Sequence, residues 1–154
     1  MIIALLILHG LLAVALLGAL THQAFAVAAV KSDKKRSFFA RFRTVNAAAY
    51  ATPIVLLFTV TALAGGLLYP DYRVAVRPAL EDLQLRAANG VFEIKEHLVA
   101  VGLGVLPAYW LFWRTPLAPE HSPTRRNLTW LLAFLVWWSF LTGHVLNNIK
   151  GLAQ

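Results

Sequence analysis

Four long apolar stretches occupy most of the chain, and shorter segments rich in charged residues and proline separate them. A helix that crosses the roughly 30 Å hydrocarbon core of a bilayer needs about 20 predominantly apolar residues. Helices suit this environment because they satisfy their backbone hydrogen bonds internally. The pattern predicts four membrane-spanning helices, at about residues 2–30, 45–68, 91–113 and 127–149.

A shorter helix is expected between the second and third spans. The sequence from Pro78 to Ala88 has a proline at a helix start and two acids in the first turn. The pair Asn89-Gly90 that follows is typical of a helix end. We therefore predict a short amphipathic surface helix over about 78–88, and a proline-rich loop over 114–126.

The composition agrees with a membrane location. The chain is 59% hydrophobic and 14% charged, whereas soluble domains are about 45–50% apolar and about 25% charged. Residues 1–30 lack the positively charged N-terminal region of a signal peptide, and their apolar run is longer than that of a signal peptide. We therefore expect a retained membrane span. The four spans use nearly all of the 154 residues. The expected fold is one all-α transmembrane domain over 1–154, an up-down four-helix bundle.

The distribution of Lys and Arg predicts the orientation of the bundle. Segment 31–43 has six basic residues and 114–126 has three, while 69–97 has four set against five acids. Cytoplasmic loops carry the excess of Lys and Arg. Both termini are therefore expected on the extracytoplasmic side, most simply of a bacterial inner membrane. The net charge of +7 then reflects topology, and nucleic acid is not an expected partner.

The absence of cysteine excludes several kinds of site. Disulfides, thiolate zinc sites, iron–sulfur clusters and covalently attached haem all need cysteine. The single methionine is Met1, so we expect no methionine ligand to haem. Histidine is left as the strong ligand for a soft metal.

Three histidines are predicted to share one depth in the membrane. At a rise of about 1.5 Å per residue, His9, His97 and His144 lie about 8–12 Å inside the outer ends of their spans. His22 falls near the cytoplasmic side with no assigned role, and His121 is expected to be a surface residue of the loop. Ionisable side chains inside spans are costly, so the three are candidates for function.

Two imidazoles from different helices of a bundle can bind the iron of haem b. His9 with His97 is the preferred pair, and His144 is a substitute or a third ligand. Gly104 belongs to a strip of small residues on the His97 face, against which a flat cofactor can lie. Four cations on the outer side are candidates to pair with the haem propionates: Arg73, Arg77, Lys95 and Lys150.

This arrangement predicts electron transfer with a quinone or a periplasmic redox protein. Two alternatives remain open. In the first alternative, the chain is an accessory subunit of a larger respiratory or photosynthetic membrane complex, or part of a homo-oligomer. Its histidines then form hydrogen bonds with neighbouring subunits. In the second alternative, His9, His97 and His144 form a copper or zinc site with Glu93 nearby.

The pairs Leu8-His9, early in the first span, and Glu96-His97-Leu98, opening the third, resemble motifs of small haem-binding membrane proteins. Among these are b-type membrane cytochromes, the non-oxygen-dependent protoporphyrinogen oxidase family and copper-resistance-D-like proteins. The resemblance implies a haem-b-binding bundle. The oxidase family enters a later span with Trp-Leu-His-x-Lys-Leu, whereas this chain has Lys95-Glu96-His97-Leu98 without the tryptophan. Histidine stands where that family has lysine, so the resemblance implies haem binding and not the oxidase reaction.

Overall fold

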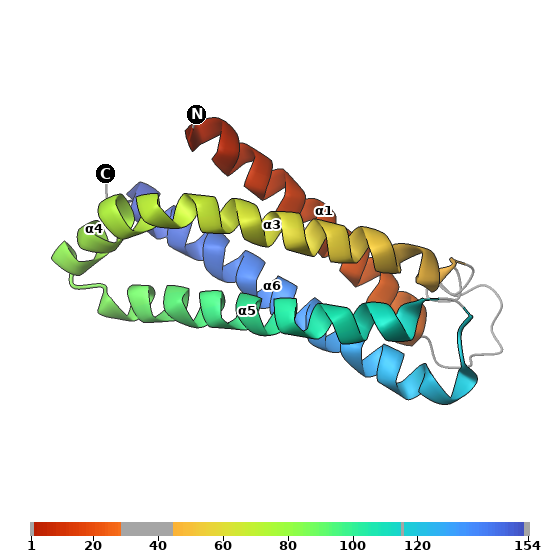
Figure 1. Cartoon of the computed structure of the whole chain (residues 1–154). Coiled ribbons are helices and arrows are strands. Elements are labelled where there is room, and N and C mark those ends of the chain that lie inside the picture. Colours follow the sequence, from red (N-terminus) through yellow and green to blue (C-terminus); the bar gives the residue numbers. More distant parts are fainter. Residues whose placement is uncertain (1, 29–44, 115, 153–154) are drawn as a thin grey trace, which may run out of the picture.

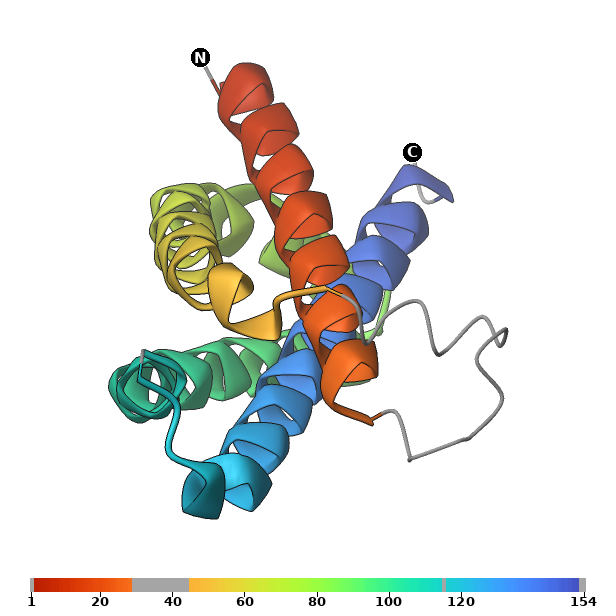
Figure 2. The ribbon, with the colours of Figure 1, turned by 90° about the vertical axis from the view of Figure 1, so that its right-hand side faces the viewer.

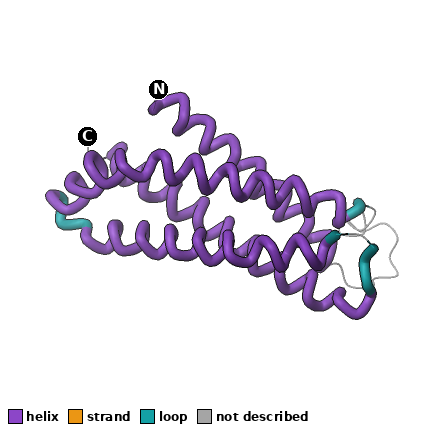
Figure 3. The backbone as a smooth tube through the Cα atoms, in the orientation of Figure 1, coloured by secondary structure: helices purple, strands orange, loops and turns teal. Residues whose placement is uncertain are grey.

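The computed structural model of the chain describes residues 2–28, 45–114 and 116–152, and these are helical with short connections. No strand occurs in these ranges, which confirms the all-α class (Figure 3). The elements in chain order are α1 (Ile2–Ala28), η1 (Ala47–Tyr50), α3 (Ala51–Asp71), the π turn η2 (Tyr72–Val76), α4 (Arg77–Asp82), α5 (Arg86–Trp113), η3 (Pro119–His121) and α6 (Ser122–Leu152).

Three of the helical segments are long and apolar enough to cross a membrane. They are Ile2–Ala28, Ala47–Asp82 and Pro119–Ile149. They contain the described part of the predicted span 2–30, residues 47–68 of the span predicted at 45–68, and all of the span predicted at 127–149. The fourth long helix, α5, is not among them. Its first part, from Arg86 to Glu96, carries four charged side chains. The span expected at 91–113 is therefore present as a helix, and its passage through a membrane stays a prediction.

Helices α3 and α5 run side by side, and α1 and α6 cross them obliquely (Figure 1). Helix α1 packs against α3 and α6, and α5 packs against α6 and α3. Both termini and α4 lie toward one end, and the connection from α5 to α6 lies at the other (Figure 1). We call these the terminal end and the connection end of the bundle. Segment 31–43, with its six basic residues, is outside the described residues.

The packed core is concentrated toward the connection end. On α1 the buried side chains begin at Leu16, which is 4% exposed, whereas Ile3 near the helix start is 74% exposed. The first half of α1 diverges from α3 and α5 (Figures 1 and 2). The cluster of buried residues comprises Leu16, Leu20, Ala51, Ile54, Phe58, Leu106, Tyr109, Trp113, Leu132, Leu135 and Val136.

Two close contacts fix the helices within this core. The ring of Phe58 on α3 lies so near Gly102 on α5 that a Cβ at position 102 would overlap its Cζ atom. The Tyr109 hydroxyl donates a 2.6 Å hydrogen bond to Gln23 Oε1, and Gln23 Nε2 donates to the Ala47 carbonyl oxygen at 2.9 Å. Gln23 is fully buried, so this paired arrangement satisfies a polar group that would otherwise be costly.

A short helix occupies the first part of the predicted segment 78–88, but its predicted end is wrong, because α4 ends at Asp82 and α5 begins at Arg86. The Leu85 amide donates to the Leu80 carbonyl at 2.8 Å and the Gln84 amide to that of Glu81 at 3.0 Å. These two bonds form a Schellman helix end. Gln84 occupies the left-handed position, at φ 60°, where glycine is usual. The sequence therefore carried no glycine signal for this break.

The expected stop at Asn89-Gly90 and the long loop at 114–126 also differ from the structure. Asn89 and Gly90 lie inside the first turns of α5. Asn89 is 6% exposed, and its side chain serves contacts with the preceding segment rather than a helix end. The loop is shorter than predicted, because η3 covers Pro119–His121 and α6 begins at Ser122. Pro123 stands in the first turn of α6, where its missing amide costs nothing.

Candidate functional site

His9 points from α1 toward α3 in the loosely packed half of the bundle. Its Nδ1 lies 3.1 Å from the Thr61 carbonyl oxygen. A carbonyl oxygen only accepts hydrogen bonds, so Nδ1 carries the proton and the neutral ring has its lone pair on Nε2. A Cβ at Gly65, one turn after Thr61, would lie 3.2 Å from His9 Cε1. The glycine therefore lets the imidazole approach the α3 backbone.

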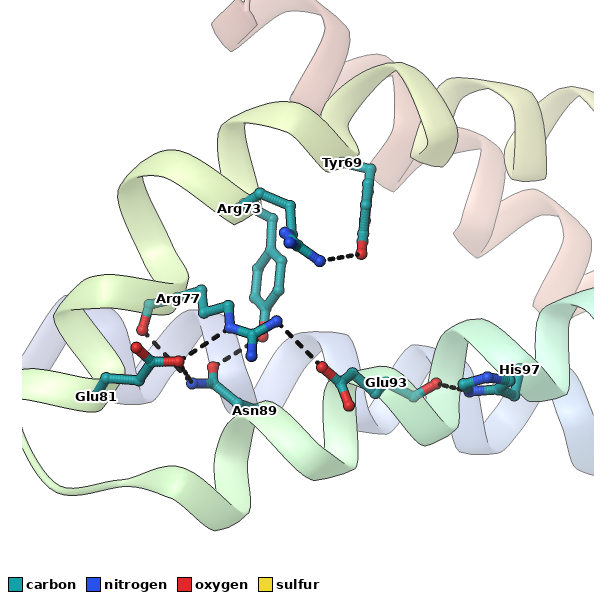
Figure 4. A network of polar contacts seen from close by, with 8 residues as sticks. Tyr69, Arg73, Arg77, Glu81, Asn89, Glu93 and His97 are labelled. Carbon is teal, nitrogen blue, oxygen red and sulfur yellow. Dashed lines mark hydrogen bonds and ion pairs between the residues drawn. The ribbon is translucent and has the colours of Figure 1, made fainter.

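His97 on α5 has the same kind of hydrogen bond within its own helix. Its Nδ1 is 2.7 Å from the Glu93 carbonyl oxygen (Figure 4). Nδ1 again donates, and Nε2 keeps the lone pair. Histidines that bind metals almost always use the second ring nitrogen in this way, which fixes the tautomer and the ring orientation. Both His9 and His97 are therefore held in a form that can act as a ligand through Nε2.

The two histidines nevertheless face different sides of the bundle. His97 is exposed, whereas Gly102 on the same helix is buried against Phe58. Five residues correspond to about 140° around a helix, so His97 is directed away from the buried face. Gly104 is also exposed, and a Cβ there would meet no atom within 4 Å. The strip expected to receive a cofactor is thus an outer surface of the single chain.

His144 is placed differently from both. It is exposed on α6, and its ring lies parallel to that of Phe140 with centroids 6.4 Å apart. Among the described residues, its ring nitrogens make no hydrogen bond that would orient them. The remaining two histidines lie toward the connection end: His22 stacks on Tyr50 at 5.1 Å, and His121 is exposed as predicted.

The described residues contain no group of three His, Cys, Asp or Glu side chains that could hold a metal ion. His9, His97 and His144 therefore do not form a three-histidine cluster in this structure. His9 does lie close enough to Lys95 and Glu96 of α5 to interact with their charges. His9 thus lies within electrostatic range of the charged turn that precedes His97.

The candidate propionate partners differ in whether an acid already neutralises them. Lys95 Nζ is 2.8 Å from Glu96 Oε1 and also lies 4.6 Å from the centre of the Phe92 ring. Arg73 contacts the Tyr69 hydroxyl at 3.3 Å and, in the described part of the chain, no carboxylate (Figure 4). Arg73 is therefore the cation best able to accept a new anion. The side chain of Lys150 is outside the described residues.

A polar network joins α4 to the start of α5 (Figure 4). Arg77 contacts Glu81 Oε1 at 2.9 Å and Glu93 Oε1 at 3.2 Å. The Tyr72 hydroxyl donates to Asn89 Oδ1 at 2.9 Å, and Asn89 Nδ2 lies 3.5 Å from the Arg77 carbonyl oxygen. Arg77 is thus occupied by two acids. Because Glu93 also supplies the carbonyl for His97, the network holds the backbone turn that orients this histidine.

Sequence reasoning missed the residues that position His9. Thr61 contributes a backbone carbonyl, which no side-chain pattern reveals, and its buried Oγ1 has no hydrogen-bond partner. Gly65 was visible only as one of two adjacent glycines in a span. An intramembrane histidine facing a glycine on a neighbouring helix is the signal that could have linked them.

Comparison with known proteins does not extend these observations. No protein-family model matches the chain, and neither a curated protein nor a solved structure matches it significantly. The resemblance of Leu8-His9 and Glu96-His97-Leu98 to haem-binding membrane proteins stays a prediction.

Proposed function

We propose that α5 is a fourth membrane span and that the chain forms a four-span, up-down bundle. Lys95 lies over the Phe92 ring, and Arg114 lies 5.6 Å from the centre of the Trp110 ring. Aromatic and basic residues collect at both surfaces of a membrane. At about 1.5 Å per residue, Lys95 and Arg114 are about 28 Å apart along the helix. This distance matches the roughly 30 Å hydrocarbon core.

The basic residues support an orientation with the connection end in the cytoplasm. Segments 31–43 and 114–126 carry most of the Lys and Arg, and such an excess marks cytoplasmic loops. Both termini then lie on the extracytoplasmic side of a bacterial inner membrane. The outer half of the bundle, with His9 and the polar network, faces that side.

Within this bundle, His9 is the residue that we propose would bind haem b in an electron-transfer protein. The observation that carries the proposal is the bond from His9 Nδ1 to the Thr61 carbonyl, which leaves Nε2 as a lone-pair donor inside the bundle. Two further features fit a bound group: the close approach at Gly65 and the unpartnered, buried Thr61 Oγ1. Haem held there would supply one-electron chemistry at iron.

Other residues of the chain would adjust this site. Arg73 has no carboxylate partner among the described residues and would attract a propionate. The Lys95–Glu96 ion pair would add a local field beside His9, because both charges already interact with it. His97 fits as a ligand only for a group that lies outside the single bundle. A quinone or a periplasmic redox protein would be the electron partner, at the terminal end.

The outer face of α5 favours a second candidate function, an accessory subunit of a larger membrane complex. His97, Ala100, Gly104 and Ala108 are all exposed on that helix. Small residues allow membrane helices to approach closely, and an ionisable side chain on such a face gains from a partner. In this function, His97 would bond to a neighbouring subunit and the chain would need no haem of its own.

A reduced-minus-oxidised absorption spectrum of the purified protein tests the haem proposal. The wild type should show haem b bands. His9→Ala should lose most of them, while His97→Ala and His144→Ala should keep them. A wild type without a Soret band, purified from haem-replete cells, would overturn the proposal. Retention of the full spectrum by His9→Ala would show that the ligand is misassigned. Iron, copper and zinc analysis of the same samples separates haem from the copper or zinc alternative.

A further inference from the structure

A small cavity opens at the connection end, away from the histidines. Its volume is about 320 Å³, within the range of about 300–1,000 Å³ that is usual for ligand pockets. One wall is apolar and the other is basic. The lining residues come from α1, α5, the connection and α6, and they are Ala26, Val27, Trp113, Leu117, Ser122, Arg125 and Arg126.

Arg125 is the unusual member of this lining. It is 8% exposed, yet none of the ion pairs among the described residues includes it. Its Nη1 donates to the Ala118 carbonyl at 2.8 Å, and its guanidinium lies 5.8 Å from the centre of the Trp113 ring. A guanidinium has five N–H donors, so most of them are available. Within the described part of the chain this buried charge has no counter-ion, which is costly and favours an anion in the cavity.

The neighbours of Arg125 hold it in position. The Trp113 indole donates to Thr129 Oγ1 at 3.1 Å, and the Thr129 hydroxyl donates to the Arg125 carbonyl at 2.9 Å. Trp113 and Thr129 are both buried. The aromatic ring beneath the guanidinium and the backbone that carries it are therefore tied together, so the donors are oriented before any ligand arrives.

The other basic wall is open to the surroundings. Arg126 is exposed and lies next to Arg125 at the first turn of α6, close to Ser122. The start of a helix carries a partial positive charge, which adds to the attraction for an anion. The Ser122 amide is already bonded to the Pro119 carbonyl oxygen, so the donors for an anion are side-chain groups. Two guanidinium groups beside a hydroxyl are suited to the several oxygens of a phosphate.

We propose that this cavity binds a phosphate group at the surface of the membrane. The phosphate belongs either to the headgroup of an anionic lipid, whose glycerol and first methylenes would lie on Ala26, Val27 and Leu117, or to a free phosphate anion. The site does not depend on haem, because it lies at the opposite end of the bundle from His9.

Binding measurements on the full chain in a mild non-ionic detergent can test the site. The probes are phosphatidylglycerol, phosphatidylcholine with the same acyl chains, and inorganic phosphate. The readouts are the lipid adducts seen by native mass spectrometry and the thermal unfolding midpoint, which a bound ligand raises. Binding to phosphatidylglycerol alone identifies a lipid headgroup site, and an equal effect of inorganic phosphate identifies a free-anion site.

Charge variants connect the binding to this cavity. Arg126→Gln removes an exposed cation and should lower the affinity for the effective probe about tenfold, as expected for one lost charge-assisted contact. Arg125→Gln should lower it further. If that variant does not fold, Arg126→Gln decides alone. Arg86→Gln is the matched control, since Arg86 is an exposed arginine at the other end.

The comparison among variants is needed because the basic segment 31–43 also attracts anionic lipid. The proposal is overturned if Arg126→Gln binds as tightly as Arg86→Gln. It is equally overturned if none of the three probes binds the wild type more tightly than detergent alone.

Discussion

A methyl group at Gly65 would lie 3.2 Å from Cε1 of His9, so the glycine sets how closely this imidazole approaches α3. The distance is tight enough that the ring would have to move by a few tenths of an ångström. Such a movement would lengthen the bond from His9 Nδ1 to Thr61, which is already 3.1 Å.

Gly65→Ala should therefore weaken haem binding several-fold without unfolding the bundle. Gly66→Ala is the matched control, because a Cβ there would meet no atom within 4 Å. Haem titration of both variants, followed by absorption, measures the effect. Equal affinities of the two variants would show that the glycine does not position His9.

Gly102→Ala should destabilise the bundle, because the new methyl group overlaps the buried ring of Phe58. Overpacking of this kind costs about 1–3 kcal/mol. Gly104→Ala should have a small effect of the opposite sign, since position 104 is open and alanine favours helix by about 0.5–1 kcal/mol. Thermal unfolding in detergent measures both. A lower midpoint for Gly104→Ala than for Gly102→Ala would contradict the packing.

Tyr109→Phe should lower the free energy of unfolding by about 1–3 kcal/mol, because it leaves Gln23 Oε1 without its buried donor. Tyr69→Phe removes a hydroxyl that receives an exposed contact from Arg73, so its effect should be small. A double-mutant cycle with Gln23→Leu measures the coupling directly. Independent effects of the Tyr109 and Gln23 changes would argue against the bond.

Asn89→Ala should destabilise the turn between α4 and α5 more than Arg77→Gln does. Asn89 is buried and pairs with the Tyr72 hydroxyl, so its loss costs about 1–3 kcal/mol. The Arg77 ion pairs are one-third to one-half exposed, and exposed pairs contribute little to stability because water competes for both charges. Added salt should reduce only the Arg77 effect. Thermal unfolding at low and high salt compares them, and the reverse order would overturn this ranking.

The absence of cysteine makes the orientation directly measurable, because one introduced cysteine gives a unique label. Arg86→Cys lies at the terminal end and Glu120→Cys at the connection end, and both positions are exposed. A membrane-impermeant maleimide added to intact cells should label the first and reach the second only after permeabilisation. The opposite pattern would reverse the orientation proposed from the basic residues.

The helices themselves were predictable from the sequence, and the directions of their side chains were not. Apolar length is a local property, so the spans predicted at 2–30, 45–68 and 127–149 each fall on a long apolar helix. The second helical segment runs further than predicted, to Asp82, and the third begins earlier, at Pro119. The position of His97 in the first half of α5 followed from its place in the chain. The direction in which it points depends on which side of α5 meets Phe58, a contact between residues far apart in sequence.

Turn chemistry explains the other difference between prediction and structure. The break after Asp82 has the full hydrogen-bond pattern of a Schellman end, but a glutamine occupies the position where glycine is expected. The sequence instead offered Asn89-Gly90, where the asparagine is committed to Tyr72 and Arg77. Asn89-Gly90 does not end a helix because its asparagine makes tertiary contacts, and a local sequence pattern does not contain these contacts.

The uneven packing along α1 affects how a molecule could reach His9. Leu16 and Leu20 fix the second half of the helix in the core, while bending of the first half would uncover little additional apolar area. In a bilayer, the gap made by such bending is filled by lipid rather than water. A hydrophobic molecule dissolved among the acyl chains can therefore approach the imidazole sideways, between α1 and α3, without ever passing through the aqueous phase.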